Sequence, residues 1–181
     1  HGTSRRQRQM CIRDSIGIIG LPNAGKSSLL AAITNANPKI ANYQFTTLNP
    51  NLGVASYDDK EITIADIPGL VEGAHKGTGL GIQFLKHIER CKSLLHMIDV
   101  TNDDLKKSYK QIKNELKKYS DKLSKKKELV VLNKVDLIDN NEVKKIIKEF
   151  SKNTKSEVIT LSTLEKKSVS QIIAKLISYA S

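Results

Sequence analysis

Short apolar runs alternate with longer segments of helical spacing along most of this chain. The apolar runs predict six strands, at about Ser15–Gly20, Leu52–Tyr57, Glu61–Asp66, Leu94–Val100, Glu128–Leu132 and Glu157–Leu161. Helical patterns are predicted over Lys26–Asn35, Leu80–Cys91, Asp103–Leu123, Asn141–Asn153 and Lys167–Ala180. Because strands alternate with helices, most of the strands should lie parallel in a sheet that is covered on both faces.

The connection between the second and third predicted strands differs from the others. Asp58 and Asp59 stand directly before Lys60 and leave room only for a tight turn, which predicts a hairpin and one antiparallel edge strand. The predicted fold class is therefore α/β: one doubly wound domain with a mostly parallel six-stranded sheet and one antiparallel edge strand.

The formal net charge of +11 is concentrated in one part of the chain. Ten lysines fall between Lys106 and Lys127, against only Glu115 and Asp121. One interpretation is a surface that attracts a phosphate-rich partner such as RNA. The other is a solvated helix face in a lysine-biased composition. The sequence leaves both interpretations open, because a basic strip gives attraction without specificity.

The first fourteen residues differ in composition from the rest. They contain four of the five arginines, while the remaining residues contain Arg90 and all 25 lysines. A basic arm that binds nucleic acid is one explanation. A tag, linker or joining scar is the explanation we favour, so we expect a non-native or disordered arm over residues 1–14 and the folded domain over residues 15–181.

The remaining composition indicates the environment of the protein. No apolar run is long enough to cross a bilayer. The two cysteines, Cys11 and Cys91, form neither a disulfide framework nor a metal-binding spacing. We therefore expect a cytoplasmic protein without a membrane span.

A glycine-rich segment leaves the first predicted strand and opens the first predicted helix. It reads Gly20-Leu21-Pro22-Asn23-Ala24-Gly25-Lys26-Ser27, with the G-x-x-x-x-G-K-S spacing of a phosphate-binding P-loop. Backbone N–H groups of such a loop point at phosphate oxygens, the lysine reaches the β- and γ-phosphates, and the serine hydroxyl binds Mg²⁺. A glycine-rich structural turn is the alternative, and the strand-to-helix context argues against it.

Two further motifs follow predicted strands. In Asp66-Ile67-Pro68-Gly69, the aspartate can hold Mg²⁺ and the glycine N–H can meet the γ-phosphate. In Asn133-Lys134-Val135-Asp136, Asp136 can accept hydrogen bonds from both guanine N1–H and the 2-amino group, a donor pair that adenine lacks. Alone, these motifs would be an ordinary turn and a helix-start turn. Together with a P-loop they predict a guanine-nucleotide site.

Two less distinctive segments complete the predicted site. The last strand ends at Leu161-Ser162-Thr163, where backbone N–H groups could meet the guanine O6. Phe45, Thr46 and Thr47 lie in the connection after the first helix, where a threonine can complete the Mg²⁺ shell when a γ-phosphate is present. His96, within an apolar strand, is most simply a buried structural residue.

Two long segments resemble the G domain of the Obg family of bacterial ribosome-associated GTPases. They are Phe45–Val54, which reads FTTLNPNLGV, and Gly73–Arg90, which reads GAHKGTGLGIQFLKHIER. The resemblance runs from about Ile16 to the C-terminus and implies the fold of a P-loop NTPase G domain. It implies a Mg²⁺-dependent GTPase that binds GTP and GDP, acts on the ribosomal large subunit or its rRNA, and is expected to be a monomer.

The resemblance also implies roles for individual residues. The Mg²⁺ ligands would be Ser27, Asp66 and Thr47 rather than Thr46, with switch I over Phe45–Asn49 and switch II over Asp66–Lys76. Many GTPases place a water-orienting glutamine after D-x-x-G, but Leu70 stands there, which implies slow hydrolysis. In related GTPases an asparagine at the position of Asn23 helps bind K⁺, and we hypothesise that K⁺ assists hydrolysis here. The candidate catalytic residues are Asn23, Lys26, Thr47 and Gly69.

The sequence also departs from the family pattern. Obg proteins carry a glycine-rich N-terminal domain, and many carry a C-terminal domain; by the pattern of this sequence we expect neither within residues 1–181. The family usually has alanine after the serine of the last motif, where Thr163 stands here. Three other readings stay open: an adenine-nucleotide relative, a nucleotide-binding interaction module with negligible turnover, and a P-loop kinase, which would not need the Asn133–Asp136 motif.

Overall fold

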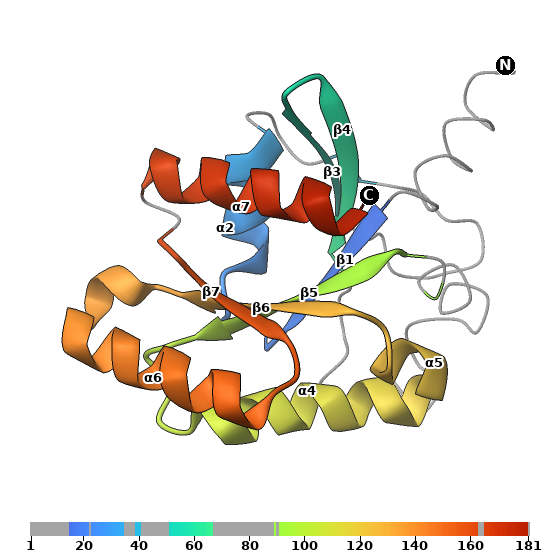
Figure 1. Ribbon diagram of the computed structural model, residues 1–181. Coiled ribbons are helices and arrows are strands. Elements are labelled where there is room, and N and C mark those ends of the chain that lie inside the picture. Colours follow the sequence, from blue (N-terminus) through green and yellow to red (C-terminus); the bar gives the residue numbers. More distant parts are fainter. Residues whose placement is uncertain are drawn as a thin grey trace, which may run out of the picture.

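The computed structural model describes residues 15–21, 23–34, 39–40, 51–66, 89, 91–162 and 165–180. Figure 1 shows one sheet with helices on both sides. In chain order the elements are β1 (Ser15–Gly20), α2 (Lys26–Thr34), β2 (Lys39–Ile40), β3 (Asn51–Tyr57), β4 (Lys60–Asp66), β5 (Ser93–Asp99), α4 (Leu105–Tyr119), α5 (Asp121–Ser124), β6 (Glu128–Asn133), the short 3₁₀ helix η2 (Val135–Leu137), α6 (Asn140–Asn153), β7 (Glu157–Leu161) and α7 (Lys166–Ala180).

The sheet has the strand order β2-β3-β4-β1-β5-β6-β7. β1 pairs in parallel with β4 and β5, and β6 pairs in parallel with β5 and β7. β3 is antiparallel to β4, as the hairpin predicts. The α/β prediction is confirmed and all six predicted strands are present. The structure adds the two-residue β2 beside β3, so β3 is the antiparallel strand next to the edge of a seven-stranded sheet.

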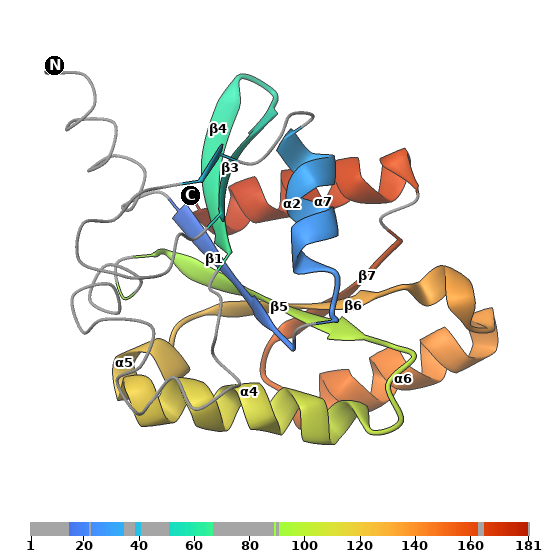
Figure 2. The same ribbon diagram turned by 180° about the vertical axis from the view of Figure 1, so that it is seen from behind.

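The two faces of the sheet have separate hydrophobic cores. α2 and α7 cover one face, where Leu29 and Leu176 belong to the same buried cluster as Ile16 of β1. α4 and α6 cover the other face, where Phe150 packs with Val130 of β6. Figure 2 shows both layers from behind. Successive residues of the buried strands alternate between the two clusters, because side chains of a strand point to opposite faces in turn.

Two connections show how local residues set the fold. Asp58 and Asp59 have φ values of 51° and 60°, as a two-residue type I′ hairpin turn requires. The single helix predicted over Asp103–Leu123 is wrong in one respect, since Ser120 separates α4 from α5. Ser120 is extended, and its hydroxyl accepts a hydrogen bond from the Leu123 N–H, so it ends one helix and caps the next.

Two predictions concern other parts of the chain. The helix predicted over Leu80–Cys91 lies outside the described residues, except at Glu89 and Cys91, neither of which is helical. Within the described residues, no helix is both long and apolar enough to cross a membrane.

Candidate functional site

The glycine-rich segment joins β1 to α2, as predicted. Gly25 has a φ of 94°, in the region that favours glycine, and a Cβ added there would collide with the side-chain nitrogen of Asn133. A Cβ at Gly20 would lie 2.6 Å from the Met97 carbonyl oxygen. The Ala24 N–H donates to the Leu21 carbonyl oxygen over 3.0 Å. Both glycines are therefore required by close packing at the end of β1, and Pro22 lies outside the described residues.

Lys26 and Asp66 lie close together, because α2 follows β1 and Asp66 ends β4, the parallel neighbour of β1. Asp66 ends β4, beside Ile18 of β1, and its Oδ1 lies 3.5 Å from the Lys26 Nζ. Both side chains are largely buried, and Asp66 Oδ1 has no hydrogen-bond partner within the part of the chain that the structure describes. Ser27, which is exposed, follows Lys26 in the first turn of α2. These residues form the inner part of the predicted phosphate and metal site.

The donor set fits Mg²⁺. A magnesium site on a nucleotide needs only one or two protein oxygen ligands, because water and phosphate supply the rest. The buried Asp66 oxygen, which pairs with Lys26 but accepts no hydrogen bond among the described residues, and the exposed Ser27 hydroxyl are of that kind. Among the described residues, no group of three or more His, Cys, Asp or Glu side chains could hold a metal ion.

A second loop, after β6, is fastened to the P-loop by two side chains. Asn133 is buried, and its Nδ2 donates to the Ala24 carbonyl oxygen over 2.9 Å. Lys134 has a left-handed φ of 64°, and its Nζ donates to the Asn23 carbonyl oxygen over 3.1 Å. Asp136 lies in η2, exposed and without a hydrogen-bond partner among the described residues. The predicted phosphate-binding and base-recognition motifs are thus held together.

Sequence reasoning missed Asp99 and Thr101. Asp99 ends β5, beside Asn133 of β6, and its Oδ2 accepts a hydrogen bond from the Lys134 Nζ over 2.6 Å. Thr101 donates to Oδ1 through its N–H and its hydroxyl. Burial opposes ionisation, but the bonds from Lys134 and Thr101 outweigh it and lower the pKa of Asp99. An acidic residue at the end of the strand before the Asn133 motif was the available signal.

The remaining predicted site residues are only partly within the described structure. Ser162 is buried, and its N–H donates to the Ser168 Oγ over 3.1 Å. The predicted contact of this segment with the guanine base stays a prediction. The other predicted residues, together with the leucine that replaces glutamine, lie outside the described residues: Phe45, Thr46, Thr47, Ile67, Pro68, Gly69, Leu70 and Thr163.

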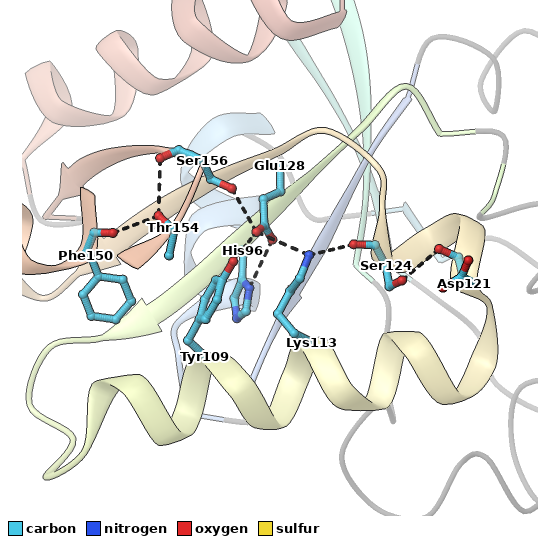
Figure 3. A network of polar contacts seen from close by, with 9 residues as sticks. All are labelled: His96, Tyr109, Lys113, Asp121, Ser124, Glu128, Phe150, Thr154 and Ser156. Carbon is cyan, nitrogen blue, oxygen red and sulfur yellow. Dashed lines mark hydrogen bonds and ion pairs between the residues drawn. The ribbon is translucent and has the colours of Figure 1, made fainter. Parts of the chain in front are cut away.

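A second polar network lies at the opposite end of the sheet (Figure 3). Glu128 is the first residue of β6, and its carboxylate accepts hydrogen bonds from Tyr109 and Ser156. Lys113 Nζ lies 3.4 Å from its Oε1, and His96 Nδ1 lies 3.5 Å from its Oε2. His96 is only 1% exposed and stacks on Tyr109, so the structure places it in the core, as predicted.

In this network, burial and the neighbouring polar groups shift each pKa in opposite directions. Burial disfavours the charged form of Glu128, but His96, Tyr109 and Lys113 together lower its pKa to about 2. Burial lowers the pKa of His96 despite the nearby carboxylate. Glu128 and Asn133 stand at opposite ends of one strand, so this network is separate from the P-loop and holds α4 to the sheet.

Solved structures with the same fold include the G domain of an iron transporter. The G domain of the FeoB iron transporter of T. maritima aligns with a TM-score of 0.68 and 22% identity, over 92% of this chain and 98% of that one. A GDP-bound NFeoB variant of S. thermophilus aligns with a TM-score of 0.68 and 22% identity, over 92% of this chain and 62% of that one. At this identity the likeness establishes the fold alone.

Curated proteins found by sequence comparison share a higher identity with this chain than these structures do. The GTPase Obg of Pelagibacter ubique is 74% identical over 166 residues, which is 92% of this chain and 51% of the relative. The GTPase Obg of Rickettsia felis is 51% identical over 158 residues, 87% of this chain and 48% of the relative. The chain thus spans about half the length of the curated relatives it matches. Residues 15–134 match the family described as 50S ribosome-binding GTPase. The resemblance to Obg proteins is confirmed, and the chain belongs to the 50S ribosome-binding GTPase family.

Proposed function

We propose that residues 15–181 form a G domain that binds GTP and GDP with Mg²⁺ and hydrolyses GTP slowly to GDP and phosphate. The observation that carries this proposal is the pair of hydrogen bonds, which we call the joint, between the P-loop and the loop after β6. Asn133 and Lys134 donate to the backbone carbonyls of Ala24 and Asn23, over 2.9 and 3.1 Å. This joint supports a single ligand that has phosphates at the P-loop and a base at Asp136.

Lys26 would bind the phosphates in competition with its present partner. Its Nζ lies 3.5 Å from the buried Asp66 oxygen, and a triphosphate would offer it several anionic oxygens as acceptors. Ser27 and Asp66 would hold Mg²⁺, with Thr47 as the proposed third ligand. When bound, the ion neutralises charge that develops on the phosphate oxygens. Gly69 would contribute a backbone N–H to the γ-phosphate.

Asp136 would select guanine. Its exposed carboxylate has no hydrogen-bond partner among the described residues, so both oxygens can accept from a base. Val135 and Lys134 precede it, and the left-handed backbone of Lys134 starts the short helix that carries Asp136. An adenine base lacks the paired donors, which makes an adenine-nucleotide function the less favoured candidate.

The Asp136→Asn variant tests base selection. We expect GTP affinity to fall by about 10-fold or more, with xanthosine triphosphate bound better than GTP, because an amide accepts on one side and donates on the other. Titration of labelled GTP, competed with ATP and xanthosine triphosphate, measures this change. Unchanged guanine preference in the variant, or equal competition by ATP in the wild type, would contradict the proposal.

We propose that K⁺ at Asn23 assists hydrolysis. The Asn23 carbonyl oxygen is engaged by Lys134, while its exposed side chain has no hydrogen-bond partner among the described residues. We expect single-turnover GTP hydrolysis to be faster in K⁺ than in Na⁺, and Asn23→Ala to remove that difference. Ser28→Ala, at an exposed position of α2, is the control that should keep it. Equal rates in both salts for the wild type would refute K⁺ assistance.

The proposed cellular role is a switch in assembly or regulation of the ribosomal large subunit, performed by a cytoplasmic monomer. Family membership supports the ribosomal partner, and a ribosomal role supports the cytoplasmic location. A nucleotide-binding module with negligible turnover is the second candidate, because Leu70 replaces the water-orienting glutamine. The same single-turnover assay, with and without ribosomes, separates them: measurable hydrolysis supports the switch, and none in either condition supports the module.

A further inference from the structure

The net positive charge of residues 15–181 comes from one segment. Residues 15–181 contain 26 basic and 18 acidic side chains, a surplus of eight. Residues 105–127, which cover α4, α5 and the link to β6, contain ten lysines and two acidic residues, also a surplus of eight. The rest of the domain is therefore neutral overall, which is not what a uniform lysine bias would give.

The segment is attached to the sheet by an apolar side and turns a polar side outward. Ile112, Leu116 and Leu123 are buried, and Figures 1 and 2 show α4 along the outside of the sheet. The α4 basic face, as we define it, contains five exposed residues, each of which lies three or four positions from another. They are Lys107, Lys110, Gln111, Asn114 and Lys117.

The lysines of this face form no ion pairs within the described residues; Lys125 lowers the pKa of the Asp121 carboxyl, and Lys117 is near enough to help lower it. Other lysines nearby are paired: Lys106 with Glu149, and Lys125 with Asp121, each over 2.6 Å. Within the described residues, no carboxylate forms an ion pair with the ammonium groups of Lys107, Lys110 and Lys117. A shallow hollow of about 570 Å³ runs along this side of α4, lined by Asp104, Lys106, Lys107, Lys110, Gln111 and Asn114.

The side chains of the face favour one kind of phosphate-rich partner. The exposed large hydrophobic residues of the described structure are Val54, Tyr57 and Leu137, and none belongs to α4 or α5. A helix that binds a membrane surface inserts apolar side chains, which this face lacks. A single-stranded nucleic acid site stacks bases on exposed aromatic rings, which it also lacks. Lysines with Gln111 and Asn114 suit phosphates and ribose hydroxyls along a duplex.

We propose that the α4 basic face binds the sugar–phosphate backbone of double-stranded RNA. The ribosomal partner of the proposed function would supply such duplexes, and only that choice of RNA rests on the proposed function. The face is separate from the nucleotide site. None of its five residues belongs to the P-loop or to the Asn133–Asp136 motif, and none takes part in the hydrogen bonds that connect the two. Binding should depend strongly on salt and weakly on base sequence.

The experiment compares two triple variants of the full chain that lose the same charge. K107Q/K110Q/K117Q alters the α4 basic face, and K144Q/K145Q/K148Q removes three exposed lysines from α6. The probes are a fluorescent RNA duplex of about 20 base pairs, a single strand of the same length, and vesicles containing phosphatidylglycerol. We expect the α4 variant to bind the duplex about 10-fold or more weakly near 0.1 M salt, with a salt slope reduced by about three.

The α6 variant should retain most of the duplex affinity, and both variants should bind GTP as the wild type does. Equal losses in the two variants would overturn the proposal, because only total charge would then matter. Preference for the single strand, or binding to vesicles without binding to the duplex, would also overturn it. Failure of GTP binding in the wild type would instead count against the proposed nucleotide function, since duplex binding is measured without nucleotide.

Discussion

At the scale of single residues, Lys134 joins three parts of the candidate site. Its ammonium contacts the Asn23 carbonyl oxygen and the Asp99 carboxylate, so it links the ends of β1, β5 and β6. Its positive φ costs some backbone energy, on the order of 1 kcal/mol or more, which these contacts offset. The Lys134 side chain is held by these contacts and remains partly exposed, so under the proposed function it would also cover the bound base.

Glu128 gives a residue-scale prediction about acid stability. Its pKa is about 2 in the folded protein and near 4.5 without its partners, so its stabilising contribution is full above pH 4.5 and is lost as the pH falls towards 2. The groups that face it are the Lys113 ammonium, the Tyr109 hydroxyl and the buried His96 imidazole, whose own pKa is lowered by burial. Glu128→Gln should destabilise the protein near neutral pH, and the difference from wild type should shrink below pH 4.5.

Urea denaturation at pH values from 7 to 3 measures this difference. Glu149→Gln is the matched control, because Glu149 pairs with Lys106 on the surface and exposed ion pairs contribute little. The control should follow the wild type at every pH. A difference between Glu128→Gln and wild type that stays constant from pH 5 to pH 3 would refute this account of the network.

At the scale of elements, α4 depends on its two ends as well as on its apolar side. The Asp104 carboxylate caps the start by accepting from the Lys107 N–H over 3.0 Å. Ser120 ends α4 with its N–H on the Leu116 carbonyl and then caps α5. The capped helix keeps the α4 basic face in register with the buried Ile112 and Leu116, so element stability and the proposed RNA surface are connected.

Replacing Asp104 tests this capping. Asp104→Ala should lower the free energy of unfolding by about 1 kcal/mol, because one N–H at the start of α4 loses its partner. Asp104→Asn should keep most of the stability, since the amide oxygen still accepts that bond. Chemical denaturation of the three proteins gives the comparison. Equal losses in both variants would mean that the charge of Asp104, and not its cap, stabilises the helix.

At the scale of the whole molecule, the candidate site lies at the carboxyl ends of the parallel strands. Gly20, Asp66, Asp99 and Asn133 end four neighbouring parallel strands, and the strand order β4-β1-β5-β6 places them side by side. Ligands of doubly wound sheets bind at these carboxyl ends. A nucleotide held there would contact loops from both halves of the sheet, so binding should stabilise the fold as a unit.

Thermal unfolding tests this coupling. With Mg²⁺ and GTP at about 100 times its dissociation constant, the folded state gains about 2.7 kcal/mol. For a domain of this size the midpoint should rise by roughly 5–11 °C. ATP at the same concentration should leave the midpoint unchanged, and Asp136→Asn should lose the GTP shift while it responds to xanthosine triphosphate. Equal shifts with ATP and GTP would exclude guanine-specific binding.

Much of this architecture was predictable because its signals are local. The alternation of apolar runs located all six predicted strands, and Asp58-Asp59 specified the hairpin. The break at Ser120 was missed, because apolar residues at helical spacing continue as far as Leu123. The helix ends at a single serine, whose hydroxyl caps the next helix. β2 was missed as well, since a two-residue strand has no periodicity of its own.

The sequence alone predicted the nature of the candidate chemistry: a P-loop at a strand-to-helix junction, an aspartate proposed to bind the metal and a motif proposed to select guanine. These depend on residue types at fixed spacing, which a chain displays before it folds. Only the tertiary structure decided the strand order, the joint between Lys134 and Asn23, and the part played by Asp99. Those residues are far apart in the sequence, and parallel pairing of buried strands, which no local pattern specifies, brings them to one edge.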